Sequence, residues 1–416
     1  MNDRREDRRG LAPALFIVFW AAQAISLFGD RLNNFSLVAL INRFSENPGL
    51  TLSSVYLSMY LPIFTLAPLI GVFVDRLNKR WVLVVTDLLR GGLVMLIPFL
   101  FTSADNFLPV MAIVFLLTTG NLFFLPAKSS LIPELVRPGR LVRANSILWG
   151  AGIAGVIGGF LGGGLIFDYL SWRACFYLDG ATYMLSAIML AVIALRPAGK
   201  GRSREVAAHH PPFWSALSEG FRVIRKSRLL GQPLGIQSII YFGAGGFSVL
   251  TMVLIRDASP PGSSMGLSIA GLAMAMGMGA GSVLVNRITL TRKLRLRAET
   301  ILFALIFPAS VLIAAGLGIG VIAAGCFIGG LAASPLVIVS ETELQMYADQ
   351  SVRGRIFSLR EILTRSLFLL SAFLMSWLGA LAGKDILLAG LGLFLACLGI
   401  LWIRIMKHGL EARTGE

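Results

Sequence analysis

The sequence predicts an all-α membrane protein with twelve transmembrane helices in two pseudo-symmetric six-helix bundles. Mean hydropathy is +0.77 and only 14% of the 416 residues are charged, whereas soluble domains have about a quarter. Apolar stretches of about twenty residues, long enough to cross a hydrocarbon core of about 30 Å, recur along the chain. Because lipid cannot satisfy backbone amides, and barrel-type alternation is missing, these stretches are expected to be helices.

The predicted spans are joined by short loops on one side and longer, basic loops on the other. They are residues 11–43, 52–74, 81–101, 107–126, 142–167, 172–195, 232–256, 263–286, 299–316, 319–346, 356–382 and 384–406. The largest connection, residues 199–230, separates an N-terminal bundle, residues 1–198, from a C-terminal bundle, residues 231–416. Its apolar residues recur at helical spacing among basic ones, which predicts an amphipathic helix at the membrane surface.

The net charge of +15 would suggest nucleic acid as a partner of a soluble protein, but the basic residues are distributed differently here. Most of the 37 Lys and Arg fall on alternate loops. The positive-inside rule then places both termini in the cytoplasm and makes lipid, rather than nucleic acid, the partner. We expect a monomeric, multi-pass protein of a bacterial cytoplasmic membrane.

The chain is not expected to be an enzyme or to hold a cofactor or metal. It has no G-x-x-x-x-G-K-[ST] phosphate loop. Its three histidines, His209, His210 and His408, all fall in predicted cytoplasmic segments. The letters of a nucleophile elbow at residues 262–266 lie in a loop without the strand and helix that such a motif needs.

The first span carries a polar stripe that is the strongest candidate for a substrate or coupling site. Its residues recur at steps of three and four, on one helical face: Gln23, Ser26, Asp30, Asn33 and Asn34. Such a face is costly against lipid, so we expect it to line a watery cavity. Burial disfavours a charged carboxyl, which makes Asp30 a candidate proton- or cation-coupling group. The alternative is an ion pair that only serves packing.

Other charges within the spans leave similar alternatives open. Arg31 points about 100° away from Asp30 and would meet Asp87, Asp179 or an anionic substrate group. Asp87 and Arg90 are three residues apart and are expected to pair. Arg360, Glu361 and Arg365, with Glu341 and Glu343 near in order, suggest a cytoplasmic charge cluster; the alternative is ordinary snorkelling of long side chains to the membrane interface.

A motif after the second span resembles the loop signature of the major facilitator superfamily, G-x-x-x-D-R-x-G-R-[RK]. Gly71, Asp75, Arg76 and Arg80 match it, and Asn78 stands where glycine is usual. Asn tolerates the left-handed backbone that glycine adopts. The resemblance implies a gate that holds one conformation until transport breaks it, with Arg143 and the helix start near Arg355 as further candidate partners of the aspartate. The cytoplasmic charge cluster could complement this Asp75 gate.

A second resemblance covers essentially the whole chain and is to the macrolide-efflux branch of that superfamily. It is carried by residues 126–135, which look like the loop after span four, by residues 143–145, by residues 27–30 and by residues 353–355. The same segments are similar to lysophospholipid transporters and to the enterobactin exporter. The chain departs from drug:proton antiporters in lacking an arginine in span four and in having Gly155 where their span-five motif has proline.

Span five also carries two parallel rows of glycine, including Gly155, Gly158, Gly159 and Gly163. Such rows let helix backbones approach closely, either as plain packing or as a sliding contact. The resemblances imply a secondary transporter that exports an amphipathic or hydrophobic, drug- or macrolide-like molecule by alternating access coupled to protons. The alternatives are a lysophospholipid flippase and a non-transporting membrane sensor or scaffold.

Overall fold

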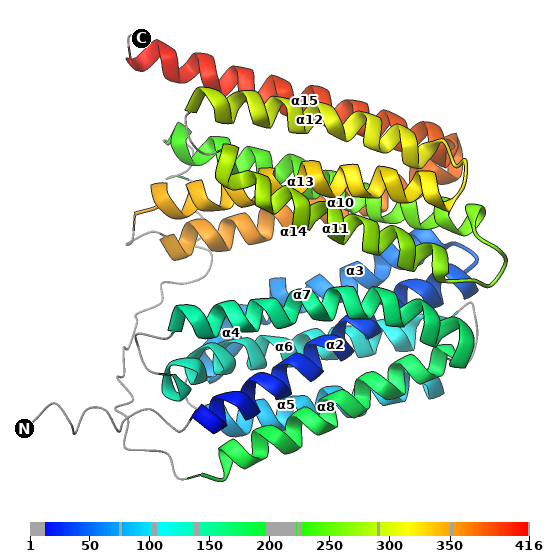
Figure 1. Ribbon diagram of the computed structural model, residues 1–416, viewed down its shortest axis with the longest axis vertical. Coiled ribbons are helices and arrows are strands. Elements are labelled where there is room, and N and C mark those ends of the chain that lie inside the picture. Colours follow the sequence, from blue (N-terminus) through cyan, green and yellow to red (C-terminus); the bar gives the residue numbers. More distant parts are fainter. Residues whose placement is uncertain are drawn as a thin grey trace, which may run out of the picture. The chain divides into compact units, whose positions relative to one another are not determined.

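The computed structural model describes residues 13–74, 77–101, 106–136, 141–196, 222, 227–288, 292–349 and 353–414, and these form helices and short connections (Figure 1). The helices are α2 (Pro13–Phe44), α3 (Pro48–Thr65), α4 (Ala67–Val74), α5 (Lys79–Leu100), α6 (Leu108–Leu135), α7 (Leu141–Leu165), the π-helical η2 (Ile166–Leu170), α8 (Trp172–Ala194), α10 (Arg228–Ala258), α11 (Met265–Ile288), α12 (Arg292–Ala314), α13 (Ile319–Tyr347), α14 (Arg353–Ala382) and α15 (Lys384–Thr414).

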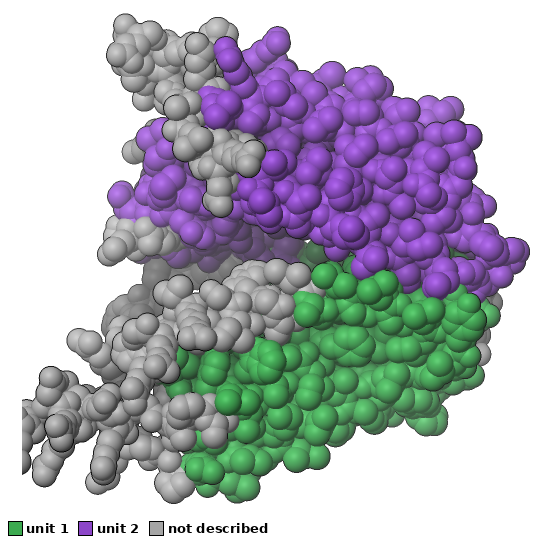
Figure 2. Space-filling model, viewed as in Figure 1, with its two compact units in different colours: residues 1–46, 55–207 green, residues 47–54, 208–416 purple. Residues whose placement is uncertain are grey.

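The helices form two compact units, shown in two colours in Figure 2. Unit 1 comprises Met1–Glu46 and Val55–Ala207, and unit 2 comprises Asn47–Ser54 and Ala208–Glu416. The first turns of α3 therefore belong to unit 2, although α3 directly follows α2 of unit 1 along the chain. This association is a tertiary feature that no local sequence pattern indicates.

The all-α, twelve-span architecture is confirmed, and two spans are irregular. Within the described residues, ten helices are long and apolar enough to cross a membrane. The second span is divided into α3 and α4, where Pro68 lacks the N–H needed to continue the helical hydrogen bonds. The fifth span ends in the π-helical turn η2, with the shorter apolar stretch Ala154–Leu170.

The fourth span is longer than predicted. Residues 126–135, expected to be a loop, continue α6 to Leu135. Pro126 does not end the helix; prolines are tolerated in membrane helices because neighbouring groups satisfy the freed backbone. Lys128 consequently lies on a helix within the spanning segment Leu108–Ile132, and not on a loop.

The glycine rows of α7 pack against α2 within unit 1. A Cβ on Gly155 would lie 3.3 Å from the carbonyl oxygen of Leu27, and one on Gly158 would lie 3.1 Å from the ring of Phe28. A Cβ on Gly159 would overlap the Cβ of Arg31 and lie 3.0 Å from its carbonyl carbon. Gly163 faces the ring of Phe35 in the same way. The glycine rows are therefore explained by the close packing of α7 against α2.

Unit 2 uses small residues in the same manner. In α11, Gly277 lies directly against the backbone of Phe327 on α13, and on α13 a Cβ at Gly330 would lie 3.0 Å from the amide nitrogen of Met278. Helix α10 packs against α13, α14 and α15, and α12 lies between α13 and α15. Apolar side chains that remain exposed on both units suit contact with lipid.

We predict that Gly159→Val lowers the thermal stability of the purified protein, because the added side chain meets the backbone of α2. Overpacking of this kind costs about 1–3 kcal/mol. Gly152→Val is the matched control on the same helix, since a Cβ there has nothing within 4 Å. Equal melting temperatures for the two variants in detergent would contradict the packing role.

Candidate functional site

A buried arginine on α5 lies at the centre of the polar contacts in unit 1. The Arg90 side chain is 2% exposed and forms an ion pair with Asp87, one turn earlier, which is 0% exposed. The pair expected from their spacing is therefore confirmed. An ion pair this deeply buried needs further hydrogen bonds to offset its desolvation.

Both members of the pair have such bonds. Arg90 Nη1 donates to Oδ1 of Asn121 on α6 at 2.6 Å, and Nε donates to the carbonyl oxygen of Thr86 at 3.4 Å. The second oxygen of Asp87 accepts a hydrogen bond from the hydroxyl of Ser186 on α8 at 2.7 Å. The pair therefore connects three helices.

Aromatic rings enclose the guanidinium. Its carbon lies 4.2 Å from the ring centroid of Phe124 on α6 and 4.6 Å from that of Tyr183 on α8. A Cβ on Gly120 would come within 3.1 Å of the Arg90 side chain, so the absence of a side chain there leaves room for it. Cation–π contacts of this kind are strongest when the cation is desolvated.

Tyr183 links this pair to the predicted coupling residue. Its hydroxyl donates a hydrogen bond to Oδ1 of Asp30 on α2, and Asp30 is half-buried. The Tyr183 side chain itself is 2% exposed. We call the connected residues the Arg90 cluster: Asp30, Asp87, Arg90, Asn121, Tyr183 and Ser186.

Two further charged residues border the Arg90 cluster. Lys128 on α6 is half-buried and interacts electrostatically with Asp30, Arg90 and Asp87. Asp179 on α8 is 0% exposed and lies against the backbone of α2 at Gly29, where a Cβ would overlap its carboxylate. The sequence indicates Asp179 only as a candidate partner of Arg31, and Lys128 only as part of the segment 126–135.

The rest of the predicted polar stripe on α2 is divided between the interior and the surface. Gln23, Ser26 and Asn33 are buried, and Asn34 is exposed. Gln23 Nε2 and Asn33 Oδ1 have no hydrogen-bond partner among the residues described. Arg31 is exposed and forms no ion pair within the described part of the chain: of the partners proposed for it, Asp87 pairs with Arg90, and Asp179 forms no ion pair there.

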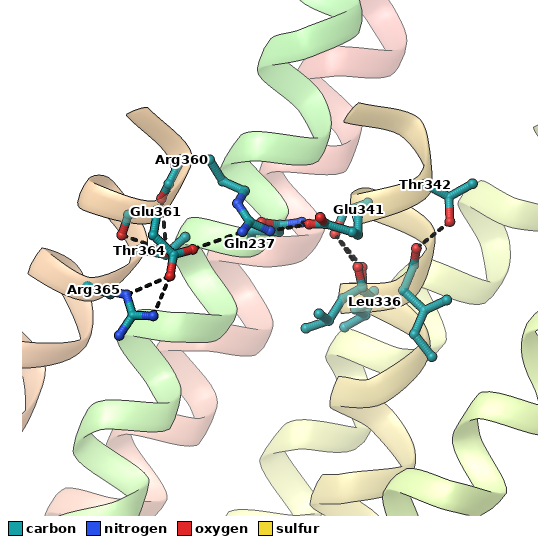
Figure 3. A network of polar contacts seen from close by, with 11 residues as sticks. Gln237, Leu336, Glu341, Thr342, Arg360, Glu361, Thr364 and Arg365 are labelled. Carbon is teal, nitrogen blue, oxygen red and sulfur yellow. Dashed lines mark hydrogen bonds and ion pairs between the residues drawn. The ribbon is translucent and has the colours of Figure 1, made fainter. Parts of the chain in front are cut away.

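Unit 2 has a second polar network, drawn in Figure 3, at the contact of α10, α13 and α14. Arg360 on α14 pairs with Glu341 on α13 and, at 2.8 Å, with Glu361. Glu361 also pairs with Arg365 one turn later, and Gln237 on α10 donates to Glu341 at 3.0 Å. This network holds equal numbers of arginines and glutamates and is 19–35% exposed.

Glu343 does not join that network, contrary to the order-based expectation. It is paired at 2.5 Å with Arg295 on α12, whose Nε lies 3.8 Å from the buried Glu299. Glu341 and Glu343 are two positions apart on α13. Because each residue turns the helix by about 100°, their side chains point in different directions around it.

Part of the predicted gate lies outside the described residues, namely Asp75 and Arg76. The surroundings of Gly71 and the side chain of Arg143 are also outside them. Arg80 is 8% exposed and donates to the carbonyl oxygen of Arg196 at 3.1 Å, joining the start of α5 to the end of α8. Arg355 is half-buried on α14.

Asn78 does not adopt the left-handed backbone expected at the glycine position of the motif. Its φ and ψ are −70° and 104°, in the extended region. Its side-chain oxygen accepts a hydrogen bond from the amide of Arg80 at 3.2 Å, so Asn78 is the N-cap of α5. A side chain that caps a helix explains Asn here better than glycine-like freedom does.

Comparison with known families decides what kind of protein carries these clusters. The family model described as Major Facilitator Superfamily matches residues 19–367. The chain belongs to the major facilitator superfamily. It is therefore a multi-pass membrane transporter and not an enzyme.

The superfamily relatives are distant in sequence. Macrolide efflux protein A of Streptococcus pyogenes is 23% identical over 273 residues, which are 65% of this chain and 66% of that protein. The chain thus spans just under two thirds of the length of that relative. An uncharacterised MFS-type transporter of Mycobacterium tuberculosis is 25% identical over 372 residues, 85% of this chain and 83% of that protein.

Solved structures of transporters share the fold. The nucleoside transporter NupG aligns with a TM-score of 0.68 at 13% identity, covering 95% of this chain and 98% of that one. A bacterial homologue of the iron transporter ferroportin, in an inward-facing state, aligns with a TM-score of 0.64 at 16% identity, covering 94% and 98%. Likeness at these identities concerns the fold alone.

We predict that Arg90→Gln destabilises the purified protein strongly, by about 3–5 kcal/mol, because it leaves Asp87 buried without its cation. The double variant Asp87→Asn/Arg90→Gln should recover part of that loss. Arg365→Gln is the control, since its partner is part-exposed and such pairs contribute about 0–1 kcal/mol. Additive losses in a double-mutant cycle followed by thermal melting would contradict the pairing.

Proposed function

We propose that this transporter exports an amphipathic or hydrophobic, drug- or macrolide-like molecule from the cytoplasm by alternating access, coupled to protons through Asp30 and the Arg90 cluster. The observation that carries the proposal is the hydrogen bond from Tyr183 to Asp30, which connects a half-buried carboxyl to a buried charge network. The similarity to macrolide efflux protein A of Streptococcus pyogenes supports the substrate class.

The position of Asp30 along α2 fits this role. It lies seventeen residues after Pro13 and fourteen before Phe44, about 25 Å and about 21 Å at 1.5 Å per residue. This is near the middle of a helix that spans the bilayer. Ionisable groups at that depth are costly and mark substrate or proton pathways.

The Arg90 cluster is also relevant to the arginine that drug:proton antiporters carry in span four and that this chain lacks there. Arg90 belongs to the third span, yet its guanidinium reaches Asn121 on α6, the fourth span, over the space left by Gly120. The chain thus has a buried arginine beside the helix where drug:proton antiporters carry one. This arrangement supports proton coupling despite the departure in sequence.

The superfamily motif supplies the proposed gate. We assign it to Gly71, Asp75, Arg76, Arg80, Arg143 and Arg355. Arg80 supports the assignment because it is buried at the start of α5 and bonded to the end of α8. The protein is proposed to act as a monomer in a bacterial cytoplasmic membrane, with both termini in the cytoplasm.

We predict that Asp30→Asn abolishes erythromycin transport driven by a proton gradient in proteoliposomes, since the amide keeps the shape and removes the charge. Asp257→Asn is the control: Asp257 is 55% exposed and pairs with Lys384 outside the Arg90 cluster. Undiminished transport by Asp30→Asn would remove Asp30 from the mechanism.

A parallel assay separates the alternative functions. Movement of a fluorescent lysophospholipid between leaflets without a proton gradient, and no erythromycin transport, would favour a flippase. Movement of neither compound under any gradient would favour the sensor or scaffold.

A further inference from the structure

Asp179 combines complete burial with poor hydrogen bonding. Its side chain is 0% exposed, and its Oδ2 has no hydrogen-bond partner in the described part of the chain. Its Oδ1 lies 3.4 Å from the hydroxyl of Thr182, which also lies 2.7 Å from the carbonyl oxygen of Asp179. Because a hydroxyl has one hydrogen to donate, the closer carbonyl takes the larger share.

The surroundings of Asp179 supply a like charge and no direct cation. The backbone of α2 at Gly29 lies against the carboxylate, and Asp30 is the charged group that interacts with it most strongly. Arg90 interacts with it more weakly, and its donors bond to Asp87, Asn121 and Thr86. No described cation forms an ion pair with Asp179.

An ionised carboxylate in this position would cost several kcal/mol, because burial removes its water and no cation replaces it. Binding a proton removes that cost. Charge balance leads to the same result, since three carboxylates, those of Asp30, Asp87 and Asp179, face two cations, Arg90 and Lys128. One proton makes the whole group neutral.

Other charged groups on the helices packed around α8 do not change this balance. Asp168 in η2 lies near Cys175, which is about one turn before Asp179 on α8. Arg31 on α2 is exposed, and its Cβ faces Gly159 of α7. Tyr183, one turn after Asp179 on α8, donates its hydroxyl to Asp30.

We propose that, within the proton-coupling site of unit 1, Asp179 is the carboxyl that binds the proton and Asp30 is the group that meets a cationic part of the substrate. The two roles are assigned from the bonding of the carboxyl groups. Asp30 accepts a hydrogen bond from Tyr183 and is half-buried, whereas Asp179 is fully buried and its Oδ2 has no hydrogen-bond partner among the described residues. This assignment rests on the proposed function for its role in transport. The bound proton itself can be tested without transport.

Infrared difference spectroscopy on the reconstituted full chain is the direct test. We expect wild type to show the carbonyl band of a protonated carboxyl that disappears as the pH is raised. Asp179→Asn should lack this band, and Asp179→Glu should keep it at a shifted frequency. Asp30→Asn and Asp168→Asn should keep it. A wild type without the band, or an Asp179→Asn variant that retains it, would overturn the assignment.

Transport measurements on the same variants test the coupling. Asp179→Asn mimics the protonated carboxyl, so erythromycin counterflow without a pH gradient should persist while acceleration by a proton gradient is lost. Acceleration equal to that of wild type would overturn the assignment. If wild type moves no erythromycin, the proposed function fails, and the infrared result still decides where the proton is bound.

Discussion

The buried guanidinium of Arg90 is the constraint on which the account of unit 1 depends. A permanent cation with 2% exposure requires carboxylates, amides and aromatic faces around it, and the chain supplies these from α5, α6 and α8. Asp87 is the direct partner, and Tyr183 extends the contacts to Asp30 on α2. Polar side chains within a membrane protein are retained where they serve such networks, because each unsatisfied group would be costly.

The two units use charge differently. The Arg90 cluster with its neighbours is deeply buried and holds more carboxylates than cations, so it is suited to binding a proton. The network of Arg360, Glu341, Glu361 and Arg365 is part-exposed and balanced, which suits interhelical contacts among α10, α13 and α14. Proton coupling is therefore proposed for the Arg90 cluster and its neighbours rather than for the network of Arg360, Glu341, Glu361 and Arg365.

Local periodicity predicts much of this structure and fails where contacts are distant in sequence. The Asp87–Arg90 pair follows from helical spacing. The partner of Asp30 could not be predicted, because Tyr183 lies 153 residues away and looks in the sequence like any other aromatic residue of a transmembrane span. Residues 126–135, which include Lys128, are expected from the resemblance to be a loop, whereas α6 continues through Pro126 to Leu135 because prolines are tolerated in membrane helices. Buried Asp179 had no pattern to distinguish it.

The central claim is that the buried charges of unit 1 bind one proton. It can be measured, because a cationic substrate and that proton would compete for the same excess of negative charge. Proton release from the detergent-solubilised protein into a weakly buffered solution, followed with a pH indicator during an erythromycin titration, tests this most directly. The account predicts release of about one proton per protein on binding, which reflects the single proton that neutralises the buried charges. Binding detected by tryptophan fluorescence with no proton released would contradict it.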